Sequence, residues 1–303
     1  MDKTKNQFTN GVAGIGHPVI LALALLIWWT TGRDDASVLL VQTITLLIIL
    51  GLEKLVPANP RWRLGLTMFA KLIGVYLLGM FATGVLLVFY DAVLVPNLKA
   101  WALPPALSPV NLPLALQIVL LFLLSDLVYY WVHRVIHNSA IFWRISGHGF
   151  HHGFHDLHGV NAGSNHPFEL VFILLPLIVI ASLTGASGEA VSGTSALLVA
   201  NVLLTHANVN MQTPIFNAIV TCSNQHRRHH SLIFSESNTN YACNAILWDH
   251  LFGTYSSGPV QQTGIGPRQP PIWKMYLLPF SEPDDADTVS TRRKQQSEKD
   301  KSS

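Results

Sequence analysis

Histidines in three short clusters are the residues of this chain best suited to chemistry. Of the 14 histidines, 13 lie between His133 and His250. Neutral imidazole binds iron, zinc, copper or nickel, and eight clustered imidazoles exceed the four ligands of one tetrahedral zinc. The sequence therefore predicts two metal ions held almost entirely by nitrogen. The clusters read His133-Arg-Val-Ile-His137, His148-Gly-Phe-His151-His152 and His226-Arg-Arg-His229-His230.

A dinuclear iron centre is the metal site that best accounts for this number of histidine ligands. Two irons activate dioxygen for attack on unactivated C–H bonds, and an all-nitrogen shell leaves them electrophilic. A zinc-dependent hydrolase is one alternative, although zinc needs fewer ligands. A membrane metal-binding or transport protein is another, but transporters place such ligands near the middle of spanning helices.

The spacing within each cluster is helical. His133 and His137 are four residues apart at the end of a predicted helix, so they share one face about 6 Å apart along the axis. In the two His-x-x-His-His clusters, positions i and i+3 face together and i+4 flanks them. All three imidazoles of each cluster can therefore reach one dinuclear centre.

Three further side chains could serve this centre. His206 ends the last apolar run, and the residues alone leave open whether it is a ligand. Asp126 lies in an apolar helix seven residues before His133, where a buried acid is costly and usually functional. We expect it to accept a ring N–H from a ligand histidine; a packing partner for Arg or Tyr is the alternative. Asp249 is a second candidate for such an outer hydrogen bond.

The elements that position these residues have the composition of a membrane protein. Charged residues make up 12% of the 303 and the mean hydropathy is +0.35, whereas soluble domains carry about 25% charged residues. We predict an all-α integral membrane protein with about four transmembrane helices and a short apolar hairpin, which either crosses or re-enters the membrane. The four helices are expected over residues 17–31, 37–52, 64–90 and from 114 through 132.

Three regions follow from this pattern. Residues 1–132 would hold the transmembrane helices, and residues 133–275 the histidine-rich catalytic region with the apolar hairpin 168–205. Residues 276–303 are expected to form a disordered polar tail, because the chain turns polar and charged beyond Phe280. With the N-terminus in the cytoplasm, four crossings place Arg33 and Lys99 outside and the other basic residues inside, so the metal site faces the cytoplasm. A net charge of +2 gives no reason to expect nucleic acid as a partner.

The histidine clusters in their sequence context resemble those of a known family. The run Ser125-Asp-Leu-Val-Tyr-Tyr-Trp-Val-His-Arg-Val-Ile-His137 resembles the first histidine box of the fatty acid hydroxylase/sterol desaturase superfamily. The two His-x-x-His-His clusters are similar to its second and third boxes. The segments Asn165–Glu169 and Thr205–Asn208, and the closing Asn240-Tyr241 with Trp248–Tyr255, are also similar to parts of the family.

This resemblance implies a multi-pass protein that hydroxylates or desaturates a lipid, using O₂, two irons and external electrons. The ligands would be the eight clustered histidines together with His206. Some relatives place another histidine where this chain has Asn210, which could act through a water. No segment resembles a cytochrome b5 module, so electrons would come from a separate donor of the cytochrome b5 or ferredoxin type. We expect that donor to bind at a basic surface near Arg227, Arg228 and the tail. The protein itself is expected in a bacterial inner membrane or the endoplasmic reticulum.

Overall fold

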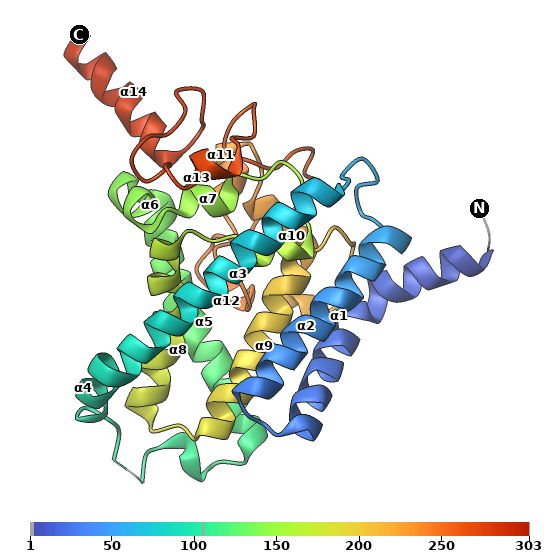
Figure 1. Cartoon of the computed structure of the whole chain (residues 1–303), viewed down its shortest axis with the longest axis vertical. Helices are drawn as coiled ribbons and strands as arrows, with labels where there is room; N and C mark the ends of the chain where they lie inside the picture. Colours follow the sequence, from blue (N-terminus) through green and yellow to red (C-terminus); the bar gives the residue numbers. More distant parts are fainter. Residues whose placement is uncertain (1–2, 105, 303) are drawn as a thin grey trace.

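Helices are the main secondary structure of the described part of the chain. The computed structural model describes residues 3–104 and 106–302, and apart from two isolated bridges these residues contain no strand. Six helical segments are long and apolar enough to cross a membrane, and they form one bundle (Figure 1). The predicted all-α membrane fold is thereby confirmed. The six are α1 (Lys3–Thr31), α2 (Asp35–Leu55), α3 (Leu66–Phe89) with its continuation through η1 (Tyr90–Leu94) and α4 (Val95–Lys99), α5 (Leu114–Asn138), α8 (Pro167–Thr184) and α9 (Gly188–His206).

Short helices carry the histidine-rich region, and most of them gather at one end of the bundle, at the top of Figure 1. They lie between or after the membrane-spanning helices and carry two of the three histidine clusters. They are η2 (Pro109–Asn111), α6 (Ala140–Ser146), α7 (His148–His152), η3 (Gly159–Gly163), η4 (Phe216–Ala218), α10 (Ser223–His229), α11 (Phe234–Ser237), α12 (Leu247–Leu251) and α13 (Ile272–Met275).

Helix α9 lies at the centre of the bundle and packs against α1, α2 and α5. Its buried face consists largely of small residues, which let neighbouring helices approach closely. A Cβ on Gly193 would lie 2.6 Å from Ile118 of α5 and 2.9 Å from Trp28 of α1, so only glycine fits there. This packing brings the histidine-bearing end of α5 beside the end of α9 at His206.

The apolar hairpin formed by α8 and α9 extends along the bundle rather than dipping into one end of it. Its tip bonds to loops at the end opposite the histidines: Ser108 Oγ donates to Thr184 O at 2.7 Å, and Arg33 Nη1 lies 3.3 Å from Glu189 Oε2. Arg33 lies in the turn between α1 and α2. Of the two possibilities that the sequence leaves open, the structure therefore favours a crossing pair.

The prediction of a disordered tail over residues 276–303 is wrong for the part of the tail that the structure describes. Helix α14 (Val289–Ser302) forms there and packs against α6. The preceding segment is held by polar contacts: Trp143 Nε1 donates to Glu282 Oε1 at 2.6 Å, and Arg144 donates to the carbonyl oxygens of Pro279 and Phe280. Hydrogen bonds to α6 and the burial of Leu278 hold this segment, and composition reveals neither contact.

We expect Glu282→Ala to lower the free energy of unfolding by about 1–3 kcal/mol, because it leaves the buried Trp143 N–H without an acceptor. Reversible unfolding in mild detergent would measure the change. Asp284→Ala is the matched control: its carboxylate is exposed beside Lys294, and its removal should change stability by no more than about 0.5 kcal/mol. Equal effects of the two substitutions would contradict the prediction.

Candidate metal centre

The structure brings all nine predicted histidines together in two buried groups. In each group the potential ligand atoms lie within 4.8 Å of one another. The groups are adjacent, since the His152 and His230 rings stack with centroids 4.3 Å apart. This arrangement suits two metal ions beside one another. Cluster A consists of His133, His137, His148, His152 and His229, and cluster B of His151, His206, His226 and His230.

Each His-x-x-His-His motif divides between the two clusters. His148 and His152, four residues apart on α7, enter cluster A, whereas His151 enters cluster B. In the other motif, His226 and His230 enter cluster B and His229 enters cluster A. The expectation that i and i+3 face together while i+4 flanks them is therefore wrong: i and i+4 share a cluster, and i+3 enters the other one. Two short helices therefore supply both clusters at once.

Hydrogen bonds on the outer nitrogens orient these rings. His133 Nδ1 donates to Tyr241 O at 2.6 Å, and His229 Nδ1 donates to Thr239 O at 2.8 Å. In cluster B, His206 Nδ1 donates to Val202 O at 2.8 Å, within α9 itself. Because a carbonyl oxygen only accepts, the proton of each neutral ring sits on Nδ1 and the lone pair on Nε2.

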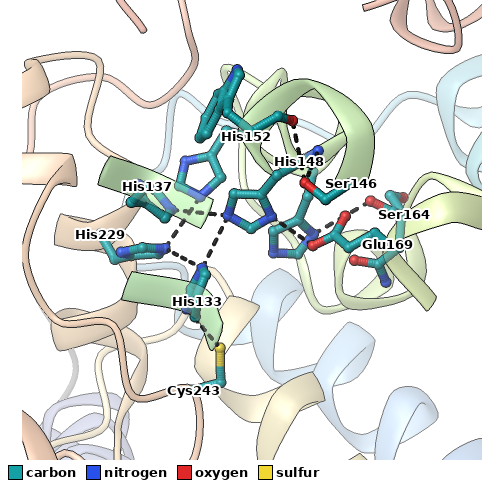
Figure 2. Close-up of polar contacts among 12 residues, drawn as sticks. His133, His137, Ser146, His148, His152, Ser164, Glu169, His229 and Cys243 are labelled. Carbon is teal, nitrogen blue, oxygen red and sulfur yellow. Dashed lines mark hydrogen bonds and ion pairs between the residues drawn. The ribbon is translucent and has the colours of Figure 1, made fainter. Parts of the chain in front are cut away.

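These Nε2 lone pairs point at one another. His133 Nε2 lies 2.9 Å from His148 Nε2 and 3.2 Å from His229 Nε2 (Figure 2), and the Nε2 atoms of His151 and His206 are 3.1 Å apart. Two lone pairs cannot hydrogen-bond to each other, but a shared cation satisfies both. Nitrogens about 2.1 Å from one metal are separated by about 3.0–3.4 Å at bond angles from 90° to tetrahedral. The residues present therefore fit metal ions in both clusters.

A glutamate that the sequence analysis assigned no role lies directly behind cluster A. Glu169 Oε1 accepts from His148 Nδ1 at 2.6 Å, and both side chains are buried (Figure 2). Its Oε2 has no hydrogen-bond partner among the described residues. A carboxylate behind a ligand imidazole fixes the ring and makes it more basic. An acid in the first turn of an apolar helix is the sequence signal that could have identified it.

The expected hydrogen bond from a ligand histidine to Asp126 is a wrong prediction. Asp126 accepts instead from the backbone of Asn244 and Ala245 at 3.0 and 2.8 Å. Asp249 likewise bonds to backbone, accepting from Tyr241 N at 2.8 Å. Both acids hold the loop whose Tyr241 carbonyl orients His133, so they support the site through the chain rather than through a ring.

Asn210 and the two arginines of the expected basic surface lie close together, and their roles stay predictions. Asn210 is exposed, and Arg227 Nη1 donates to its Oδ1 at 3.4 Å. Arg227 also donates to backbone carbonyls after His206, and Arg228 pairs with Glu236 at 3.3 Å. Both arginines are thus held by neighbouring segments of their own chain, and an electron donor at this basic surface stays a prediction.

Burial keeps the cluster histidines that lie outside the membrane helices neutral. It lowers the pKa of His151 from 6.5 to about 3 and the pKa values of His148, His152 and His229 well below 6.5, with neighbouring imidazoles adding to the effect. The neutral ring is the form that binds a metal. Burial also raises the pKa of the Cys243 thiol well above its usual range, so this sulfur, 3.7 Å from His133 Nδ1, stays protonated.

We expect the metal-free protein to lose stability as the pH falls below about 6.5. The unfolded chain then binds protons on its histidines while the folded clusters, whose pKa values are lowered, do not. The melting temperature in detergent should stay level from about pH 8 to 7 and fall continuously below 6.5. The metal-loaded protein should resist this fall, since its lone pairs are occupied. A metal-free protein with a level profile down to pH 5 would contradict this reasoning.

Comparisons with known proteins agree with this geometry. Residues 118–254, which include all nine histidines, match the family described as fatty acid hydroxylase. Ornithine lipid hydroxylase OlsE of Rhizobium tropici is 30% identical over 283 residues, covering 87% of this chain and 82% of that protein. Methylsterol monooxygenase 2-2 of Arabidopsis thaliana is 27% identical over 140 residues, 46% of this chain and 52% of that protein. Alkylglycerol monooxygenase of Xenopus tropicalis is 31% identical over 136 residues, 45% of this chain and 30% of that protein.

No solved structure matches the chain. The similarity to the ornithine lipid hydroxylase nevertheless extends over most of both proteins, and the family match contains both histidine clusters. The chain therefore belongs to the fatty acid hydroxylase/sterol desaturase superfamily.

Proposed function

We propose that this protein is a di-iron monooxygenase that hydroxylates a membrane lipid. Its family and relatives establish the broader class, a membrane enzyme that oxidises lipids. The observation that carries the finer proposal is the convergence of Nε2 lone pairs in two adjacent clusters built from nine histidines. Five nitrogens in cluster A exceed the four of a tetrahedral zinc site, which favours iron over the hydrolytic alternative.

In this proposal the nine histidines are the ligands, and iron bound to them supplies activation of O₂ and oxidation of a C–H bond. The overall reaction consumes R–H, O₂, two electrons and two protons and gives R–OH and water. The electrons come from a separate donor of the cytochrome b5 or ferredoxin type. The chain itself orients the rings through Tyr241 O, Thr239 O and Glu169, and burial of the clusters excludes bulk water.

The substrate that we propose is a polar lipid of the ornithine lipid type. The relative named for that lipid is similar to this chain over 87% of its length, so the likeness includes membrane helices outside residues 118–254. The sterol and alkylglycerol enzymes match only 46% and 45% of the chain. These three relatives are named as hydroxylases or monooxygenases, which supports hydroxylation over desaturation.

We propose further that the metal site faces the cytoplasm, in a bacterial inner membrane or the endoplasmic reticulum. Arg33 and Glu189 pair at the end of the bundle opposite the histidine clusters. Most of the other basic residues belong to the histidine-rich region and the tail. An excess of Lys and Arg marks the cytoplasmic side of membrane proteins. The histidine clusters lie at the ends of the membrane helices, which argues against a transporter, whose ligands lie near the bilayer midplane.

Lipid analysis would test the proposed function directly. The protein is expressed in a bacterial host that makes ornithine lipids, and the lipids are examined by mass spectrometry. We expect a product heavier by one oxygen atom, about 16 Da, that incorporates ¹⁸O from ¹⁸O₂ and requires iron. Purified protein that holds about two irons per chain would agree. Unchanged lipids in hosts offering ornithine lipids, sterols or alkylglycerols would contradict it.

A further inference from the structure

A carboxylate from a distant membrane helix holds the segment that follows His206. Glu53, buried in the last turn of α2, accepts from Asn208 N at 3.0 Å through Oε1. Asn59, just beyond α2, donates its N–H to Asn208 Oδ1 at 2.8 Å and accepts from Asn208 Nδ2 at 3.0 Å. The end of α2 thereby fixes the backbone two residues beyond a cluster B histidine.

The same carboxylate holds the segment that leads to the outer partner of a second cluster B histidine. Its Oε1 also accepts from Gly159 N at 2.8 Å, and its Oε2 lies 3.1 Å from His158 Nδ1. Gly159 begins η3, and directly after η3 the carbonyl of Ser164 accepts from His151 Nδ1 at 3.3 Å. Two of the four cluster B rings are therefore tied to one side chain.

Arg227 binds the backbone carbonyl groups of the segment that follows His206. Its Nη2 donates to Ala207 O at 3.2 Å and to Val209 O at 3.5 Å, and its guanidinium lies 5.7 Å from the Trp62 ring centroid. Arg227 directly follows the cluster B residue His226. A carboxylate thus accepts from the N–H groups of this segment while a guanidinium donates to its carbonyls.

We propose that Glu53 is a positioning residue for cluster B, acting through the backbone beyond His206 and through the loop that reaches His151. The proposal rests on the metal centre proposed above. Two carboxylate oxygens meet three donors here. A glutamine has one acceptor oxygen and would turn an N–H group towards a donor. Glu53→Gln should therefore displace cluster B without touching a ligand.

Metal titration of the full-length protein in detergent tests this role. Metal-free protein is titrated with Fe(II) under anaerobic conditions and, in parallel, with Zn(II). We expect two metals to bind per wild-type chain. In Glu53→Gln the second metal should bind about 10- to 100-fold more weakly, the usual effect of losing outer support, while the first keeps its affinity. His206→Ala, which removes a cluster B ring itself, should lose the same metal.

Glu189→Gln is the matched control, because it changes a glutamate that pairs with Arg33 at the far end of the bundle; both of its metals should bind as in wild type. If Glu53→Gln fails to fold, Asn208→Ala breaks the Asn59 contacts and should weaken the second metal alone. Wild-type affinity for both metals, or equal weakening of both, would overturn the positioning role. Binding of fewer than two metals by the wild type would also overturn it. Absence of lipid hydroxylation would instead contradict the proposed function. The metal titration would still test the positioning role of Glu53.

Discussion

Replacing His229 with alanine is expected to abolish hydroxylation and to release the metal of cluster A. His229 Nε2 lies 3.2 Å from the Nε2 atoms of both His133 and His152, so its ring joins two other parts of the cluster. Loss of an outer partner alone costs about 10- to 100-fold in metal affinity or activity. Loss of a ligand should exceed about 100-fold. Iron content and product formation, measured on the same preparation, check this.

His250→Ala provides the matched control for that substitution. His250 is exposed and stacks on Tyr255 with ring centroids 4.0 Å apart, outside both clusters. This variant should keep two metals and near-wild-type turnover. If His229→Ala retained both metals and its activity, the assignment of cluster A as a metal site would be wrong.

Glu169→Ala should lower activity and the metal affinity of cluster A about 10- to 100-fold, although Glu169 is not one of the proposed metal ligands. The substitution removes the acceptor 2.6 Å from His148 Nδ1. The freed ring can rotate or take the other tautomer, and its Nε2 lone pair then no longer points at the metal. Metal retention and kcat should both fall, while KM for the lipid should change little.

Glu169→Gln separates orientation from charge in this site. The amide oxygen of glutamine still accepts from His148 Nδ1–H, so this variant should retain more metal and activity than Glu169→Ala. Equal losses in the two variants would show that the carboxylate charge matters more than the hydrogen bond. Wild-type behaviour of both would remove Glu169 from the site.

The sequence alone identified the candidate metal-binding histidines because imidazole spacing is a local property. His133 and His137 lie on one helix face by periodicity, and the two His-x-x-His-His motifs carry their own spacing. All eight of these rings, and His206, lie in the two clusters. The membrane fold was equally predictable, since a long apolar run indicates a membrane-spanning helix without information from the rest of the chain.

The tertiary structure decided which rings share a cluster and what stands behind them. His229 meets His133 across 96 residues of chain, and Glu53 meets Asn208 across 155; no local period encodes such pairs. The Asp126 prediction failed for the same reason, because its partners Asn244 and Ala245 are brought near only by packing. The tail, too, is ordered by Trp143 and Arg144 of a distant helix. The sequence determined the candidate ligands, their spacing and the membrane setting, whereas long-range packing determined how these histidines are grouped and which residues support them.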